Sequence, residues 1–260
     1  MSAILLGQEI VHYEVLGRGR PLIFLHGWVG SWRYWIPVMQ AATMSFRAYA
    51  VDLWGFGDSA HSPRKYTLEQ QARLLDGFMN EMGMGRVALI GHGLGALVAE
   101  LFARQHAEIV DRVMLVGCPL DESMVNARLR SAAPADLADW LLGRDPLNDA
   151  ARSDALKTDP AAVTASFSGM AALKDYWRNM PTACLLVNGQ NDPAVEAPRL
   201  DQLADLPEHT HAVAFEQSGH FPMLEEGSKF SRLMSDFLTL PSGESPRVLQ
   251  LKEEWKRRVR

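Results

Sequence analysis

The stretch Gly91–Gly95 has the spacing of a turn that presents a nucleophile, but its central residue cannot act as one. It reads Gly-His-Gly-Leu-Gly and fits the pattern G-x-S-x-G, except that Gly93 stands where the pattern has serine. In that pattern a sharp strand-to-helix turn exposes the serine hydroxyl, and nearby backbone N–H groups stabilise the oxyanion formed when it attacks a carbonyl carbon. The sequence therefore predicts a turn suited to acyl transfer whose attacking atom is absent.

The periodicity of apolar residues indicates which elements hold this turn. Short apolar runs alternate with segments of helical spacing, a pattern typical of a mostly parallel sheet that helices cover on both faces. The expected strands are residues 9–15, 21–25, 47–52, 86–91, 112–117, 182–189 and 210–216, and the expected helices are residues 67–82, 95–106, 198–205 and 224–239. The sequence predicts a doubly wound α/β fold, in which ligands bind at the carboxyl ends of the strands.

The alternation of strands and helices breaks in the middle of the chain. There, Ala, Leu, Arg and Asp dominate at helical spacing, and prolines punctuate the segment. We expect this segment to form a helical cap over the carboxyl edge of the sheet. The predicted division is an α/β core of residues 1–120 and 181–240, a helical cap of residues 121–180, and a basic amphipathic tail of residues 241–260.

Composition narrows the class of protein and of partner. The sequence has 260 residues, 47% of them hydrophobic, which is enough for one sizeable core. A net charge of −5 argues against nucleic acid as a partner and favours a small-molecule ligand. No run approaches the roughly eighteen apolar residues of a membrane span, and the start lacks a secretion-signal pattern, so we expect a cytoplasmic protein. Cys118 and Cys184 are expected to be free thiols, and nothing in the composition indicates an oligomeric state.

Neither a metal nor another cofactor is expected. The eight histidines lack the H-x-x-x-H and H-E-x-x-H spacings of metal sites, and the two cysteines are isolated. Residues 91–96 do fit the dinucleotide pattern G-x-G-x-x-G/A. However, the candidate ribose-binding acid, Asp111, precedes the strand expected at 112–117, whereas that acid belongs at the carboxyl end of the second strand.

Five short motifs together resemble one known family. Each alone is a weak signal, but their order and spacing along the chain are specific. They are residues 26–30 (HGWVG), 52–59 (DLWGFGDS), 91–95 (GHGLG), 189–192 (GQND) and 218–221 (SGHF). Over roughly residues 8–240 the chain resembles the α/β-hydrolase superfamily, and it is similar to short-cap carboxylesterases such as pimeloyl-ester hydrolases and to carbon–carbon-bond hydrolases. The resemblance implies an eight-stranded, mostly parallel sheet with a helical cap insertion.

The resemblance also implies roles for particular residues. His220 resembles the base that takes a proton from the nucleophile and returns it to the leaving group. Asp192 resembles the acid that orients the imidazole, and Asp121 is the alternative acid, because some members carry theirs on that loop. The backbone N–H groups of Trp28 and Leu94 resemble the oxyanion hole.

Loops at the expected carboxyl edge carry many aromatic residues. Trp54, Phe56 and Phe221 are the predicted pocket residues, and they favour a substrate with apolar or aryl groups. Asp52 and Asp58, on one of these loops, are expected to hold backbone rather than to do chemistry.

Gly93 leaves three functions open. The first is a carboxylic ester hydrolase that is inactive or very weak as written, whose serine form would cleave a small or medium ester. In it, His220 could still activate a water in the space left by the serine side chain. The second is a ligand-binding protein without catalysis. The third is cofactor-free proton transfer by the pair His220 and Asp192, of lyase or oxygenase type. The remaining base, acid and oxyanion groups favour the first.

Overall fold

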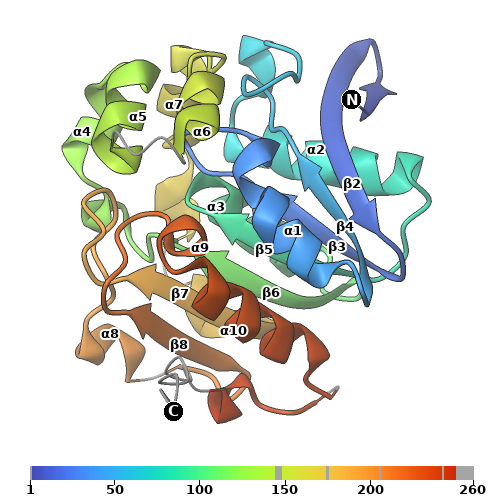
Figure 1. Ribbon diagram of the computed structural model, residues 1–260, viewed down its shortest axis with the longest axis vertical. Coiled ribbons are helices and arrows are strands. Elements are labelled where there is room, and N and C mark those ends of the chain that lie inside the picture. The colour runs from blue at the N-terminus through green and yellow to red at the C-terminus, as the bar shows by residue number, and fades with distance from the viewer. Residues whose placement is uncertain (1, 144–147, 174–175, 205, 242, 250–260) are drawn as a thin grey trace, which may run out of the picture.

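An eight-stranded sheet runs through the molecule, with helices on both of its faces (Figure 1). The computed structural model describes residues 2–143, 148–173, 176–204, 206–241 and 243–249. The strands are β1 (Ser2–Leu6), β2 (Glu9–Gly17), β3 (Arg20–Leu25), β4 (Phe46–Val51), β5 (Val87–His92), β6 (Val110–Val116), β7 (Ala183–Gly189) and β8 (Thr210–Phe215). Their order is β1-β2-β4-β3-β5-β6-β7-β8, and only the pairs β1–β2 and β2–β4 are antiparallel. The predicted doubly wound, mostly parallel sheet of eight strands is confirmed.

Two pairs of helices cover the sheet. Helices α1 and α10 pack against each other on one face, and α2 and α3 pack together on the opposite face (Figure 1). Their bounds are α1 (Ile36–Ala42), α2 (Leu68–Glu81), α3 (Leu94–Gln105) and α10 (Gly227–Thr239). Helix α3 lies against β3, β5 and β6 as well as α2, so its residues from Leu94 to Ala103 are all buried. This helix follows the Gly91–Gly95 turn and fixes it to the centre of the sheet.

Three elements differ from the sequence-based expectation. Strand β1 and helix α1 were not predicted, because β1 is a half-exposed edge strand and α1 has only seven residues. The helix expected at 224–239 is two helices, α9 (Pro222–Glu225) and α10, because the backbone of Glu226 leaves the helical region. The helix expected at 198–205 is the short α8 (Leu200–Leu203).

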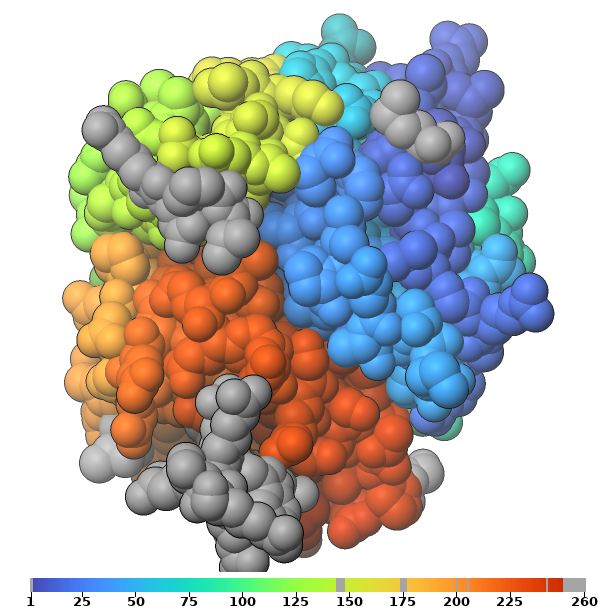
Figure 2. All heavy atoms as spheres, viewed as in Figure 1, coloured from blue at the N-terminus to red at the C-terminus, as the bar shows by residue number. Residues whose placement is uncertain are grey.

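The segment between β6 and β7 consists mainly of short helices. They are η3 (Glu122–Met124), α4 (Ala127–Ser131), α5 (Pro134–Leu142), α6 (Asp149–Ala155), α7 (Pro160–Ser166), η5 (Met170–Leu173) and η6 (Tyr176–Asn179). Helix α6 contacts η1 (Trp32–Trp35), which follows β3, and η5 contacts α3, so the segment lies at the carboxyl ends of the strands. In the space-filling view it lies directly against the blue N-terminal and orange C-terminal parts of the chain (Figure 2). The division into core and cap stays a prediction.

The end of the chain is described only in part. Residues 246–248 form the short helix η7 (Pro246–Val248), whereas most of the predicted amphipathic helix falls on residues 250–260, outside the described residues. No helix in the described ranges has the length and apolar character that a membrane crossing requires.

Candidate active site

The turn after β5 has the backbone geometry that a nucleophile elbow requires. Gly93 has φ 51° and ψ −111°, a conformation that is costly for residues with a Cβ atom and accessible to glycine. The two flanking glycines allow close packing of strand and helix. A Cβ atom at Gly91 would overlap the carbonyl oxygen of Gly95, and one at Gly95 would overlap the carbonyl oxygen of Leu25. The side-chain position at residue 93 therefore points away from the tightly packed backbone, toward the loop after β3.

His220 and Asp192 form a buried pair beside this turn. Asp192 follows β7, His220 follows β8, and each side chain is only 1% exposed. The Nδ1–H group of His220 donates to Oδ2 of Asp192 at 2.8 Å. The other carboxylate oxygen accepts from the N–H groups of Ala194 and Val195 at 2.7 and 3.1 Å, which fixes the orientation of the carboxylate. With Nδ1 used in this way, Nε2 is the nitrogen left for proton transfer.

The alternative acid, Asp121, has a different place. Its carboxylate accepts from the N–H of Ser123 at 2.9 Å and caps the short helix η3. His220 is hydrogen-bonded to the carboxylate of Asp192. The catalytic roles of both remain predictions.

The two predicted oxyanion donors lie on adjacent segments. Leu94 begins α3 directly after Gly93, and Trp28 follows Gly27, whose Cα is 3.6 Å from the point where a Cβ atom of residue 93 would lie. Both residues are buried, and in the described part of the chain no acceptor takes a hydrogen bond from either N–H. Buried N–H groups normally have a partner, so this pair could bind an oxyanion or another acceptor of a ligand.

A chain of hydrogen bonds joins the oxyanion loop to the histidine loop through the turn itself. The Nε2–H group of His92 donates to the carbonyl oxygen of His220 at 2.9 Å. Its Nδ1 atom therefore accepts from the hydroxyl of Tyr34 at 2.9 Å, and the Tyr34 oxygen accepts from the N–H of Gly27 at 2.7 Å. Burial, together with the nearby His220, holds the pKa of His92 well below its usual range, in agreement with a neutral imidazole. Sequence reasoning missed both His92 and Tyr34, although residue 92 lies within the motif.

The indole ring of Trp28 covers the nucleophile position. A Cβ atom at residue 93 would lie 2.9 Å from both Cε3 and Cζ3 of Trp28, closer than real contacts allow. The indole is stacked on the ring of Phe167, with ring centroids 5.5 Å apart and an interplanar angle of 13°, and faces the ring of His220 at 6.4 Å and 22°. Its Nε1–H group donates to Oγ of Ser166 at 2.9 Å. The sequence predicted an oxyanion role for the backbone N–H of Trp28 and a place for its ring among the aromatic residues of the carboxyl-edge loops, but it did not predict that the indole would cover position 93.

The three predicted pocket residues are buried and lie in different surroundings. Phe221 packs against the rings of His92 and His220, with centroids 4.8 and 5.1 Å apart. It also lines, together with His220 and Trp140, a crevice of about 400 Å³. Phe56 packs on His26, and the ammonium group of Lys65 lies over the ring of Trp54. Neither Trp54 nor Phe56 lines that crevice.

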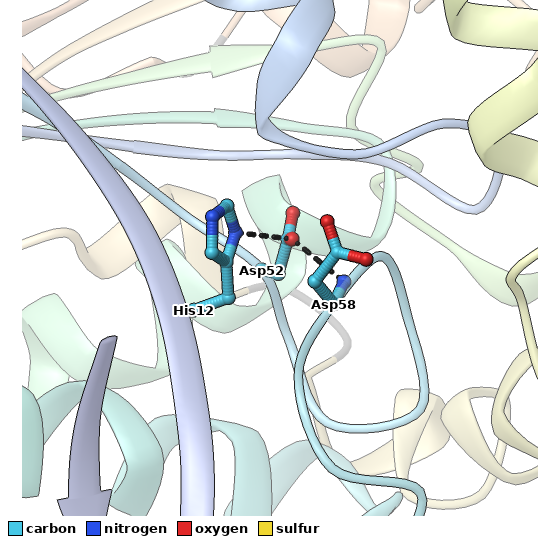
Figure 3. Close-up of side chains that lie close together, drawn as sticks. All are labelled: His12, Asp52 and Asp58. Carbon is cyan, nitrogen blue, oxygen red and sulfur yellow. Dashed lines mark hydrogen bonds and ion pairs between the residues drawn. The ribbon is translucent and has the colours of Figure 1, made fainter. Parts of the chain in front are cut away.

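The loop after β4 is held by a buried carboxylate (Figure 3). Asp52 accepts hydrogen bonds from the N–H groups of Trp32 and Asp58 and from Nδ1 of His12. Burial acts to lower the pKa of His12, but the hydrogen bond and charge of Asp52 outweigh it and raise that pKa. His12, Asp52 and Asp58 are close enough together to hold a metal ion, but Lys157 binds Asp58 at 2.8 Å and Asp52 is engaged by backbone donors. Their arrangement fits the structural role expected for Asp52 and Asp58.

Comparison with known proteins identifies the family. A sequence profile described as "Alpha/beta hydrolase family" matches residues 22–233. The chain is 24% identical to the 2-hydroxy-6-oxo-6-(2'-aminophenyl)hexa-2,4-dienoic acid hydrolase of Metapseudomonas resinovorans, over 87% of each protein. It is 26% identical to the pimeloyl-(acyl-carrier protein) methyl ester esterase of Vibrio cholerae, over 88% of this chain and 98% of the esterase.

Among solved structures, the fold is similar to that of the meta-cleavage product hydrolase CumD from Pseudomonas fluorescens IP01. The TM-score is 0.79 at 21% identity, and the match covers 92% of this chain and 97% of that one. This likeness concerns the fold, whereas the sequence profile extends across most of the core and the segment between β6 and β7. The chain belongs to the alpha/beta hydrolase family.

Proposed function

We propose that this protein has the framework of a carboxylic ester hydrolase, whose form with serine at position 93 would cleave a small or medium ester with an apolar or aryl group, and that the chain with Gly93 forms no acyl-enzyme. The support is the set of groups beside the elbow. His220 is bonded to Asp192, and the buried N–H groups of Trp28 and Leu94 are available to an acceptor on a ligand. The esterase and hydrolase names of the relatives agree with this reaction class.

The chemistry of a form with serine at position 93 follows from these groups. Nε2 of His220 would take the hydroxyl proton while the oxygen attacks the ester carbonyl, and Asp192 would stabilise the imidazolium that results. The N–H groups of Trp28 and Leu94 would hold the oxyanion. His220 would then return the proton to the leaving alcohol, and a water would release the acid by the same steps in reverse.

One observation supports inactivity of the chain as written. The indole of Trp28 occupies the space in which a side chain at position 93 would lie. The loss of the hydroxyl removes the attacking atom, and the indole leaves little space for a water to replace it. This favours a ligand-binding protein without catalysis as the second candidate function. The cytoplasmic location stays a prediction.

The test restores the hydroxyl and removes the obstructing ring. The variant Gly93→Ser/Trp28→Leu keeps both oxyanion N–H groups, and Gly93→Ala/Trp28→Leu is its matched control without a hydroxyl. Hydrolysis of p-nitrophenyl acetate, butyrate and octanoate should be at least about 10³-fold faster for the serine variant, because removal of the triad serine from the unrelated serine protease subtilisin costs about 10⁶-fold in kcat. Equal rates for the two folded variants would contradict the esterase framework and leave ligand binding as the function.

A further inference from the structure

We propose that the space enclosed by Gly93, Phe167, His220 and Ser166 is a binding site for a planar bicyclic aromatic ligand with a hydrogen-bond donor on its edge. In this structure the site is filled by the chain's own Trp28, which the ligand displaces. The inference rests on the proposed function in one respect, because it places the ligand at the same elbow. It specifies the shape and polarity of the ligand, and it identifies Trp28 as the side chain that competes with the ligand for the site.

Two rings lie nearly parallel to the indole. The centroid of the Phe167 ring is 5.5 Å away at an interplanar angle of 13°, and that of the His220 ring is 6.4 Å away at 22°. The edge of the indole meets Gly93, where glycine leaves space that any side chain would fill. Stacked aromatic pairs contribute beyond their buried area, so a flat bicyclic ring matches these surroundings better than an aliphatic chain does.

The polarity of the site is given by Ser166. Its side chain is fully buried, and its hydroxyl donates to the carbonyl oxygen of Val163 at 2.6 Å. With its hydrogen used in this way, the Ser166 oxygen can only accept, and it accepts from Nε1–H of Trp28 at 2.9 Å. A ligand ring with an N–H or O–H group on that edge reproduces this bond, whereas a ring without a donor does not.

The position of Trp28 in the chain favours exchange. The residue lies on the loop between β3 and η1, outside regular secondary structure, and the one hydrogen bond of its side chain within the described residues is the bond to Ser166. Displacement of the indole therefore breaks one side-chain hydrogen bond and no backbone hydrogen bond of the sheet. The crevice lined by Trp140 borders His220, the ring that lies nearly parallel to the indole.

The first experiment empties the site and fills it with probes of matched shape. Indole and benzothiophene are titrated by calorimetry into Trp28→Ala, into Trp28→Ala/Ser166→Ala, and into Trp177→Ala, which removes a different buried tryptophan. Benzothiophene has nearly the same shape as indole and no N–H group. We expect indole to bind Trp28→Ala at least tenfold more tightly than it binds Trp177→Ala or the unaltered chain. Trp28→Ala should bind indole about two- to tenfold more tightly than benzothiophene, because one neutral hydrogen bond contributes a difference of that size. In Trp28→Ala/Ser166→Ala the two ligands should bind equally.

The proposal is overturned if indole binds Trp28→Ala no better than Trp177→Ala, or if benzothiophene is preferred whether or not Ser166 is present. Because loss of a buried indole can prevent folding, a second measurement uses the unaltered chain. Labelling with 5-fluorotryptophan gives a ¹⁹F resonance for each of the seven tryptophans, and Trp28→Phe assigns one of them. Titration with 2-naphthol, a bicyclic ring with a donor, should shift the Trp28 resonance toward that of an exposed indole. Binding of 2-naphthol that shifts other resonances and leaves that of Trp28 unchanged contradicts displacement.

These outcomes are separate from the ester hydrolysis test. A serine variant that hydrolyses esters while Trp28→Ala binds no indole would uphold the proposed function and overturn this inference. The reverse result would show an aromatic site without an esterase framework.

Discussion

At the scale of single residues, Gly93 and Trp28 form a complementary pair. Glycine allows the backbone conformation of the elbow at little steric cost, and it leaves the volume into which the indole fits. The two residues depend on each other, because the indole fits only where residue 93 has no side chain and any side chain at position 93 would overlap the indole.

This pairing predicts a measurable coupling. Gly93→Ala should destabilise the protein by about 1–3 kcal/mol, because alanine is strained at φ 51° and its Cβ contacts the indole. In the Trp28→Leu background the same change should cost about 1 kcal/mol less, since the contact is relieved. Urea unfolding of the four proteins gives the coupling energy, and strictly additive effects would argue against the pairing.

A second prediction concerns Glu100, which is buried on α3 and is not part of the proposed chemistry. Burial raises its pKa to about 8, so the folded protein keeps a proton that the unfolded chain loses near pH 4.5. The contribution of this group to stability is therefore full below pH 4.5 and falls as pH rises to about 8. Each pKa unit corresponds to about 1.4 kcal/mol, so the decrease should be on the order of a few kcal/mol.

Glu100→Gln should remove most of this decrease, because a neutral amide has no proton to lose. The check is urea unfolding at pH 5, 6.5 and 8, with the exposed Glu81→Gln as the matched control. The same slope of stability against pH in both variants would show that Glu100 is not the group responsible.

The candidate catalytic residues could be predicted from the sequence, whereas the side chains that pack against them could not. Motif spacing indicated His220 and Asp192, and the structure brings them within hydrogen-bond distance. The stacking of Trp28 on Phe167 joins residues far apart in the chain, and no local pattern encodes such a contact. The relay through His92 and Tyr34 was missed for the same reason.

At the scale of elements, the site depends on loops that are tied to one another rather than on any single strand. Asp52, after β4, binds His12 of β2 and the N–H of Trp32 at the start of η1. Ser166, at the end of α7, binds the indole of Trp28 after β3. A single substitution at Asp52 or at Ser166 can remove the corresponding hydrogen bonds.

Asp52→Asn should destabilise the protein by about 3 kcal/mol near pH 6, because it leaves the buried His12 without its counter-ion. The pKa of His12 is raised in the folded state, so its contribution is full below about pH 6.5, the unfolded value, and is lost as pH rises through the raised pKa. The destabilisation should therefore be smaller at pH 9 than at pH 6. Unfolding curves at both pH values test this, with the exposed Asp201→Asn as control, and an equal loss at both would contradict the assignment.

Ser166→Ala should cost about 1–3 kcal/mol, because it leaves the Nε1–H group of a buried tryptophan without an acceptor. The exposed neighbour Ser168→Ala is the matched control and should change stability by less than about 0.5 kcal/mol. Differential unfolding of the two variants measures the difference. Indistinguishable stabilities would mean that the hydrogen bond does not hold α7 to the core.

Most elements of the sheet could be predicted because their periodicity is strong. Strands β2 to β8 and helices α2 and α3 lie within a few residues of their expected positions. Strand β1 lacks the alternation of polar and apolar residues that marks a half-buried strand, and α1 is too short to show helical periodicity. Their formation depends on tertiary pairing with β2 and on packing against α10.

At the scale of the whole molecule, the alpha/beta hydrolase fold is retained while the centre of its site is changed. The structure combines the eight-stranded sheet with the glycine turn after β5 and the hydrogen-bonded pair His220–Asp192, and we propose that these groups form the framework of a hydrolase. The turn carries no hydroxyl at position 93, and the indole of Trp28 lies where a side chain at that position would lie. We therefore expect this framework to support acylation once Gly93 and Trp28 are both replaced.

Covalent labelling can show whether position 93 is acylated. A fluorophosphonate probe is added to the unaltered chain, to Gly93→Ser/Trp28→Leu and to Gly93→Ala/Trp28→Leu, and intact mass with peptide mapping locates any adduct. We expect no adduct on the unaltered chain or on the alanine variant, and one adduct at position 93 of the serine variant. An adduct elsewhere on the unaltered chain, or a folded serine variant that stays unlabelled, would contradict this expectation.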